Sequence, residues 1–503
     1  MSKRSATEVV TADGQPFAKA SGSGSKRDDI TRDEMGEFED AWEDELESDE
    51  EVVDVEAADG MEVDELVPAI EESDEPQPAL DAFIPGRHKL GPDEILEPDD
   101  SVYIMRHSMK VTWPCLSFDV LRDSLGDERQ RYPATAYLVA GTQADLAKNN
   151  EVVVYKLSSL HRTQKDGDDS DSEDDDADDD ENLDEDPIVE YRSIPHLGGV
   201  NRVRAQPLPP SSQLPAVSQP YHVASWAETG KVHIWDVRPL IESLDVPGYS
   251  TDKRRTHSPV YTVSSHGRAE GFAMDWAATG SSLRLVTGDI NSKIYLTSSS
   301  PSGFNTATQP FTSHTSSVED LQWSPTELTV FASCSADRTV RIWDIRARGR
   351  QSAACIDSAH DSDVNVISWN KSQANLLLSG GDDGRIKIWD LRNIQNQGCI
   401  TSAAPVSFEW HQAPITSVEW HPTDDTVFAA SGADDQISMW DVSVEPDDDE
   451  MGGTDATQDV PAQLLFNHQG QTDIKELHWH PQIPGAILST ASDGFNIFKT
   501  ISL

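Results

Sequence analysis

The chain has 503 residues and a formal net charge of −51, which argues against nucleic acid as a direct partner, because phosphate would be repelled, and favours a basic protein. The four cysteines neither form a disulfide framework nor share a zinc spacing, so a reducing compartment is expected. No signal peptide and no membrane-spanning apolar run is visible, which predicts a soluble intracellular protein with no membrane partner.

The first segment, residues 1–80, is expected to be a disordered acidic extension. Its stretch Asp28–Glu75 holds 24 acidic residues and one basic residue, too little apolar surface to fold alone. Within it, Phe38, Trp42 and Leu46 recur at intervals of four, which would place them on one helical stripe. We interpret them as an anchor that inserts beside a basic partner; the alternative is a tail with incidental apolar residues.

Residues 81–110 are expected to contain a lead-in and one strand. The run "SVYIMRH", Ser101–His107, has strand character and ends in His. Upstream of it, Pro92 and Pro98 leave little room for a long helix.

The main domain, residues 111–503, opens with three strand-like runs, "WPCLSFDV", "AYLVAGT" and "EVVVYKL". A fourth run, "PIVEYRSIPH", comes only after the tract Asp166–Asp186, in which 15 of 21 residues are acidic. The tract is therefore predicted to be an insertion between the third and fourth strands of one unit. A dedicated calcium site is not expected, because an EF-hand needs Gly where this tract has Asp171. The tract also contains two candidate phosphorylation sites, Ser170 and Ser172.

The middle of the chain repeats one unit. In "SHTSSVEDLQWSPTELTVFASCSADRTVRIWDIR" and the two copies after it, a His is followed by Asp after 23 residues and by Trp after 29. A fainter copy upstream keeps the spacing, with Tyr in place of Trp. Each copy holds three strand-like runs, and a fourth precedes the next His. The repeated residues are His266 and Asp289; His314, Asp337 and Trp343; His360, Asp383 and Trp389; and His411, Asp434 and Trp440.

Four strands per unit ending in Trp-Asp resemble a blade of the WD-repeat β-propellers. Weaker units at His196 and His468, together with the first unit, bring the count to seven. We therefore expect an all-β fold, a seven-bladed WD-repeat β-propeller with a disordered acidic N-terminal extension. The resemblance implies that the repeated His, Asp and Trp form a buried structural network. An enzyme needs one catalytic site, whereas this pattern occurs four times, so neither catalysis nor a cofactor is expected.

Two short motifs, "EWHP" with His421 and "ELHWHP" with His478 and His480, suggest metal ligands. However, other units have Ser324 and Asn370 where His421 and His480 stand. A position that accepts Ser or Asn is not a required ligand, and no metal site is expected.

The chain reaches its last residue, Leu503, directly after the third strand of the seventh unit. An open edge would invite wrong pairing, so Ser101–His107 is predicted to supply the fourth strand and close the ring. A second acidic insertion, Glu445–Asp459, lies between the third and fourth strands of the sixth unit. Since all such connections leave a propeller on one face, both acidic insertions should hang over the same sector.

The blocks "FIPGRHKLGPDEILEPDDSVYIMRHSMKVTWPCLSFDVLRD" and "FEDAWEDELESDEE" resemble the glutamate-rich WD-repeat proteins of ribosome assembly. The resemblance implies a monomeric chaperone of a newly made large-subunit ribosomal protein of the L-three type. It also implies work in the nucleus and nucleolus, with shuttling to the cytoplasm. Besides the anchor, the expected client-binding residues are Asp168, Asp169, Asp171, Glu173, Asp174, Asp175, Asp176, Asp178, Asp179, Asp180, Asp447, Asp448, Asp449 and Glu450.

Two alternatives remain open. "VYIMRHSMKVTWPCLSF" and "PAQLLFNHQGQTDIKELHWHP" also resemble the histone-binding WD-repeat proteins of chromatin assembly, in which a blade 6 loop holds a histone helix. The motifs "WDVR", "WDIR" and "WDLR" are similar to the box by which WD-repeat substrate receptors dock on cullin-type ubiquitin ligases. Because the fold already requires Trp and Asp, only the arginines carry information, namely Arg238, Arg346 and Arg392.

Overall fold

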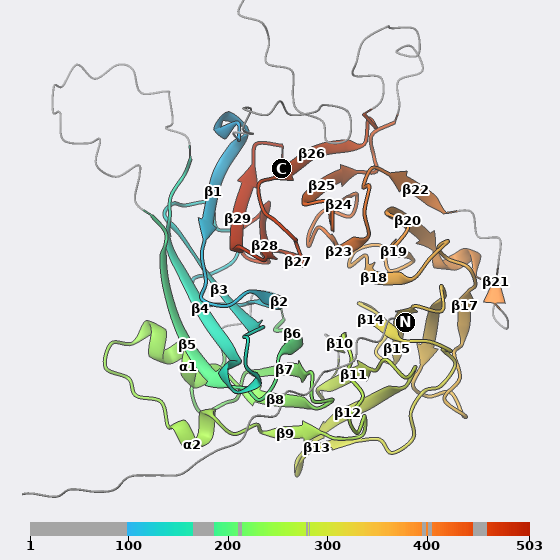
Figure 1. The fold of residues 1–503 in the computed structure, drawn as a ribbon, viewed down its shortest axis with the longest axis horizontal. Coiled ribbons are helices and arrows are strands. Elements are labelled where there is room, and N and C mark those ends of the chain that lie inside the picture. The colour runs from blue at the N-terminus through green and yellow to red at the C-terminus, as the bar shows by residue number, and fades with distance from the viewer. Residues whose placement is uncertain are drawn as a thin grey trace, which may run out of the picture. The chain divides into compact units, whose positions relative to one another are not determined.

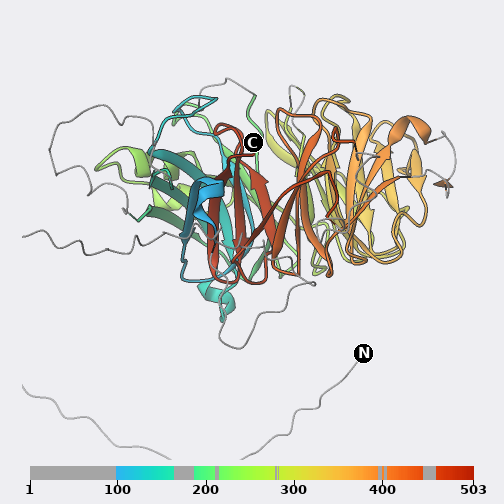
Figure 2. The ribbon, with the colours of Figure 1, turned by 90° about the horizontal axis from the view of Figure 1, so that it is seen from above.

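The computed structural model describes residues 98–163, 186–209, 214–277, 280, 282–394, the backbone of 399–400, 405–445 and 460–502. They belong to the compact unit Ala82–Leu503, and the other unit, Met1–Asp81, lies outside the described residues. The described part forms seven sheets around a central axis (Figure 1), and its strands run between two faces of the ring (Figure 2). The predicted all-β, seven-bladed WD-repeat propeller is confirmed.

Each sheet is an antiparallel meander whose strands we letter a to d from the axis outward. Blade 1 contains β2 (Cys115–Leu121), β3 (Ala134–Thr142), β4 (Glu151–Leu160) and β5 (Ile188–Pro195). Blade 2 contains β6 (Val200–Ala205), β7 (His222–Ala227), β8 (Val232–Asp236) and β9 (Tyr261–Val263). Blade 3 contains β10 (Ala273–Trp276), β11 (Arg284–Gly288), β12 (Ile294–Ser300) and β13 (Gly303–Thr306).

The next three blades are the clearest sequence copies. Blade 4 contains β14 (Val318–Trp323), β15 (Val330–Ser335), β16 (Val340–Asp344) and β17 (Ala354–Ile356). Blade 5 contains β18 (Val364–Trp369), β19 (Leu376–Gly381), β20 (Arg385–Asp390) and β22 (Val406–Glu409). Blade 6 contains β23 (Ile415–Trp420), β24 (Val427–Gly432), β25 (Gln436–Asp441) and β26 (Leu464–Gln469).

Blade 7 joins the two ends of the propeller. Its strands a to c are β27 (Glu476–Trp479), β28 (Ala486–Ala491) and β29 (Gly494–Thr500), and its strand d is β1 (Tyr103–Met109), far upstream in the chain. β1 and β29 pair from Tyr103 with Thr500 to Met109 with Phe495. The missing fourth strand thus comes from the segment that the sequence predicts, although a 3₁₀ turn, η1 (Asp100–Val102), delays its start by two residues.

The close approach of these strands requires a glycine. Gly494 has φ +133°, and a Cβ there would collide with the carbonyl oxygen of Met109. A side chain at position 494 would therefore disturb the seam at which the ring closes.

The hydrophobic core lies between neighbouring blades. Met105 from blade 7 packs with Phe118 from blade 1 and Phe495 from blade 7 in one buried cluster, so closure of the ring also seals its core. Further around the ring, Phe331 stacks on Trp343 in blade 4, and Phe428 stacks on Trp440 in blade 6 in the same way. The repeated Trp of strand c therefore has a packing role in each of these blades.

A few short elements decorate the connections. α1 (Arg238–Asp245) and α2 (Lys253–Thr256) lie between β8 and β9, and the 3₁₀ turns η2 (Ala147–Asn149) and η4 (Leu391–Asn393) follow β3 and β20. β21 (Cys399–Ile400) pairs parallel to the outer strand of blade 4. Among the helices of the described residues, none is long and apolar enough to cross a membrane.

Candidate functional site

The two acidic insertions attach to one face of the ring. We call the side on which strand c connects to strand d the c–d face. In blade 1 the connection leaves β4 at Leu160 and enters β5 at Ile188; in blade 6 it leaves β25 at Asp441 and enters β26 at Leu464. Because every blade is the same meander, both connections lie on the c–d face, one on each side of blade 7.

The insertions are described only at their edges. Asp186 and Glu445, which border the two tracts, are exposed. Outside the described residues lie the anchor (Phe38, Trp42 and Leu46), both serines (Ser170 and Ser172) and the fourteen carboxylates expected to bind a client: Asp168, Asp169, Asp171, Glu173, Asp174, Asp175, Asp176, Asp178, Asp179, Asp180, Asp447, Asp448, Asp449 and Glu450.

Exposed apolar side chains gather on the same face of blades 7, 1 and 2. Leu125 in the a–b connection of blade 1, Ile188 at the start of β5 and Ile501 after β29 are 55%, 52% and 59% exposed. Val246 and Tyr249 follow α1 in the c–d connection of blade 2 and are exposed as well. This sector therefore combines apolar contact points with the attachment of the longer acidic tract.

The repeated residues form one hydrogen-bond chain in each of blades 4 and 5. In blade 5, Nδ1 of His360 lies 3.0 Å from the Asp383 carboxylate, and Nε2 lies 2.7 Å from Oγ of Ser379. Since the carboxylate must accept, Nδ1 donates, Nε2 accepts from Ser379, and Ser379 accepts from Trp389 Nε1 at 2.8 Å. The equivalent residues of blade 4 are His314, Asp337, Ser333 and Trp343.

Blade 6 keeps this chain but changes the origin of the hydroxyl. The position equivalent to Ser379 is Ala430, and Ser438, two residues before Trp440, bridges His411 and Trp440 instead. Nδ1 of His411 still donates to Asp434, at 2.9 Å. In blade 3, His266 contacts Asp289 and Thr287, both at 2.8 Å. The network therefore preserves its hydrogen bonds rather than its residues.

The buried position of these groups shifts their ionisation in opposite directions. Burial would raise the pKa of Asp337, but the hydrogen bond from His314 lowers it well below its usual range. Burial also lowers the pKa of His314, which keeps the imidazole neutral near pH 7. A neutral donor and an ionised acceptor fix the imidazole in one orientation, as a structural tie requires.

His421 and His480 act as turn caps. Nδ1 of His480 accepts from the backbone N–H groups of Gln482 and Ile483, both at 3.0 Å, and Nδ1 of His421 accepts from the N–H of Asp424 at 2.9 Å. In blade 5 the Asn370 side chain accepts from two backbone N–H groups in the same turn. Burial lowers the pKa of His480 to about 3, so its ring stays neutral and can accept.

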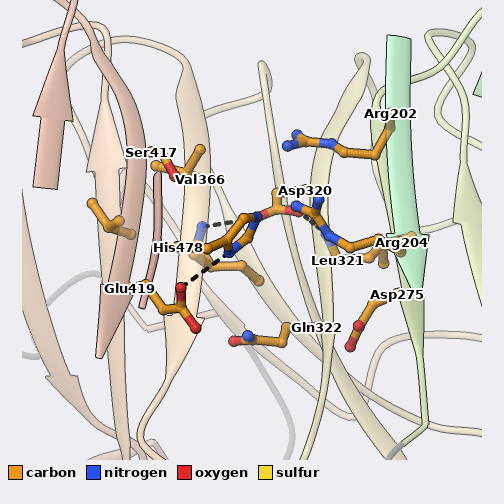
Figure 3. Close-up of a pocket in the computed structure, with 12 residues that line it drawn as sticks. Arg202, Arg204, Asp275, Asp320, Leu321, Gln322, Val366, Ser417, Glu419 and His478 are labelled. Atoms are coloured by element: carbon orange, nitrogen blue, oxygen red, sulfur yellow. Dashed lines mark hydrogen bonds and ion pairs between the residues drawn. The ribbon is translucent and has the colours of Figure 1, made fainter. Parts of the chain in front are cut away.

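A cluster of charged side chains lies at the centre of the ring (Figure 3). Nε2 of His478 lies 3.7 Å from Glu476, and Nδ1 lies 3.0 Å from Glu419. Burial alone would lower the pKa of His478, but these two carboxylates raise it to about 10. His478 is therefore a cation with both nitrogens protonated, and such a ring has no lone pair for a metal.

Glu476 ties three blades together. Its Oε1 accepts from Arg202 at 2.7 Å and from Arg204 at 2.8 Å, and its Oε2 accepts from the N–H of Phe118 at 2.8 Å. Burial would raise the pKa of Glu476, but the two arginines hold it well below its usual range. The carboxylate thus links strand a of blade 7 to strands a of blades 1 and 2.

Similar links run around most of the ring, and reasoning from sequence missed them. The residue before the tryptophan of strand a accepts the backbone N–H of the tryptophan in the next blade. Glu419 accepts from Trp479 at 3.1 Å, and the indole of Trp479 donates back to the Glu419 carbonyl at 3.1 Å. The same acceptance joins Asp275 to Trp323, Gln322 to Trp369 and Ser368 to Trp420. A polar residue directly before each such tryptophan was the available sequence signal.

The central cluster encloses a cavity of about 70 Å³ lined by both signs of charge. Asp275 faces it, and burial raises its pKa to about 7. Among the described residues, no three His, Cys, Asp or Glu side chains are arranged to hold a metal ion. The arginines and carboxylates engage one another or the backbone, which is the chemistry of a structural plug.

The three arginines of the Trp-Asp-x-Arg motifs differ in exposure. Arg238 is buried at the start of α1 and donates to the Pro215 carbonyl and to Glu242. Arg346 and Arg392 are about three-quarters exposed, with side-chain exposed fractions of 70% and 73%, and each pairs with the Asp two residues before it. Only the arginines of blades 4 and 5 are therefore presented to a partner on the c–d face.

The chain matches two family models. One, described as the histone-binding protein RBBP4 or a component of the CAF1 complex, matches residues 93–161, which contain β1 and the first three strands of blade 1. The other, the WD domain with G-beta repeats, matches residues 305–344, 353–390 and 404–441. These three ranges contain most of blades 4, 5 and 6.

Three relatives cover most or all of the chain. Ribosome assembly protein rrb1 of Schizosaccharomyces pombe is 48% identical over the full length of both chains. Glutamate-rich WD repeat-containing protein 1 of Dictyostelium discoideum is 46% identical over 82% of this chain and 84% of its own. Protein HEAT STRESS TOLERANT DWD 1 of Arabidopsis thaliana is 45% identical over 83% of this chain and 91% of its own. With its seven blades, ring-closing N-terminal strand and acidic insertions, the chain belongs to the glutamate-rich WD-repeat family of ribosome assembly proteins.

Proposed function

We propose that this protein is a non-enzymatic escort that binds a newly made basic ribosomal protein, of the L-three type, and delivers it to the assembling large subunit. One observation carries the proposal: acidic insertions enter the c–d face of blades 1 and 6, on either side of blade 7. The work of such an escort would lie in the nucleus and nucleolus, with shuttling to the cytoplasm.

The two parts of this face suit a basic client in different ways. The rigid ring presents exposed apolar side chains such as Leu125 and Ile188, which can hold one fixed part of the client. The insertions bring 15 and seven acidic residues, which can cover lysine and arginine side chains without a fixed register. Release would then be competition with ribosomal RNA, itself a polyanion, and would need no chemistry.

The decisive experiment measures client binding across salt concentration. In one variant, every Asp and Glu of 166–186 and 445–459 becomes Asn or Gln; a matched control permutes the residues of each tract and keeps the charge. With purified L-three protein we expect the neutral variant to lose at least about tenfold in affinity at low salt and to bind with little salt dependence. The permuted control should bind like wild type. Unchanged affinity and salt dependence in the neutral variant would refute the proposal.

Histone binding is the second candidate, because the family model over residues 93–161 carries a histone-binding description. Competition separates the two: a histone H-four peptide should displace the ribosomal protein only if both use one surface. Recovery of core histones rather than a ribosomal protein from cells at low salt would favour the histone function. Recovery of a ligase adaptor, lost when Arg346 and Arg392 are changed to Ala, would favour the substrate-receptor function.

A further inference from the structure

Two of the four cysteines meet at the outer edge of blade 4. β17 pairs parallel to β21, and in this pairing Cys355 stands opposite Cys399 and Ile356 opposite Ile400. β21 belongs to the c–d connection of blade 5, between β20 and β22, so the pair joins two blades. Cys355 is buried, with 3% of its surface exposed.

The register brings the two backbones within reach of a disulfide. Neighbouring strands lie about 4.7–4.9 Å apart. A disulfide needs Cα atoms about 4.4–6.8 Å apart, and residues opposite each other on adjacent strands meet this condition. The other two cysteines lack such a partner: Cys115 stands opposite Thr142, and Cys334 stands opposite Asp320 and Val340.

We propose that Cys355 and Cys399 form a reversible thiol pair that hydrogen peroxide converts to a disulfide. One thiol is oxidised to a sulfenic acid, and the peroxide leaves as one water. The second thiol then attacks the sulfenic sulfur, forms the S–S bond and releases the hydroxyl as a second water. Two electrons pass from the two thiols to one peroxide, and a cellular dithiol reductant reverses the step by exchange.

The bond would pin a weakly held segment. β21 has two residues, so its pairing opens easily and admits peroxide to the buried Cys355. Oxidation would fix the c–d connection of blade 5 against blade 4. That connection begins at η4, which contains the exposed Arg392. The oxidised protein would therefore present the surface around Arg392 in one restricted conformation, independently of how the acidic tracts bind a client.

Peptide mapping of the full-length protein tests the pair directly. Trypsin and a Glu-specific protease place Cys355 in peptide 351–371 and Cys399 in peptide 393–409. After brief treatment with hydrogen peroxide and alkylation without reductant, we expect these two peptides to be cross-linked in more than half of the monomeric protein. Dithiothreitol should release them. Hydrogen exchange at the β17–β21 amides should slow at least tenfold on oxidation and recover on reduction.

Wild-type protein supplies the main result, so no variant needs to fold for the test to be read. Cys399→Ser should abolish the cross-link and leave peptide 351–371 linked to nothing, whereas Cys334→Ser, as a matched control in blade 4, should retain it. The proposal is overturned if peroxide leaves both peptides unlinked, if Cys355 is oxidised only to sulfinic acid, or if the link joins two copies of the chain.

Discussion

His478 shows how a residue that looks like a metal ligand can have the opposite chemistry. Its spacing from His480 in "ELHWHP" suggests a site, but the partners that decide its charge are Glu419, distant in sequence, and Glu476. No local pattern reveals that two carboxylates meet this ring. By contrast, the cap role of His480 was within reach of the sequence, because Ser324 and Asn370 occupy the same place in other blades.

The charge on His478 predicts a loss of stability at alkaline pH. Its pKa in the folded protein is about 10, against 6.5 when exposed, so the folded state holds the proton more tightly. The stabilisation is complete below about pH 6.5 and is lost as pH rises toward 10. Urea unfolding of wild type and His478→Gln should therefore show the largest difference in midpoint near pH 6.5 and a shrinking difference up to pH 9.5. A constant difference would contradict a cationic His478.

The serine of the repeat network should matter wherever it stands in the sequence. Ser379→Ala in blade 5 and Ser438→Ala in blade 6 each leave a buried His and a buried Trp without their shared hydroxyl. Each change should lower the free energy of unfolding by about 1–3 kcal/mol, the cost of unsatisfied buried polar groups. The exposed Ser372→Ala is the matched control and should change it by less than about 0.5 kcal/mol. Chemical denaturation measures all three.

At the scale of elements, sequence reasoning succeeded where the repeat imposed one geometry. Identical offsets of 23 and 29 residues from His to Asp and Trp require identical strand and turn lengths, so blades 4, 5 and 6 followed directly. The links between blades were harder to foresee, because Asp275, Gln322 and Ser368 perform one role with three side chains. Hydrogen bonding constrains the acceptor and leaves the residue type free.

β1 should behave as a separable part of blade 7. Deletion of residues 98–109 would expose the edge of β29 and the cluster that contains Phe118 and Phe495. We expect a clear fall in Tm and concentration-dependent aggregation, because an open hydrophobic edge pairs with other chains. A synthetic peptide of residues 98–110 should restore Tm in trans, whereas the same peptide with Met105→Asp should not. An unchanged Tm after deletion would show that β1 does not hold the ring closed.

At the scale of the whole molecule, the charge is segregated. Outside Asp28–Glu75, Asp166–Asp186 and Glu445–Asp459 the chain is nearly neutral, with 44 acidic and 38 basic residues. The ring therefore avoids the self-repulsion that −51 charges would cause in a compact body, while the attached segments supply a long-range field. Composition alone revealed this division, but only the strand order placed two of the segments on one face.

This division predicts how client binding responds to charge. Neutralising both insertions should slow association at low salt by about tenfold or more and change dissociation much less, because steering acts before contact. At high salt, where the field is screened within a few ångströms, the two association rates should converge. Stopped-flow mixing with labelled client measures both rates. An effect confined to dissociation would place the acidic residues in the contact surface instead.

The seam between β1 and β29 also sets a timetable for synthesis. β1 leaves the ribosome early, but its partner ends at Thr500, nearly four hundred residues later. At about 5–20 residues per second the strand waits roughly 20–80 s before it can pair. During that interval its apolar side chains, Met105 and Met109 among them, have no blade to enter. The highly charged stretch encoded just upstream is well placed to keep the nascent chain dispersed, so the end of translation, rather than any early folding step, completes the ring.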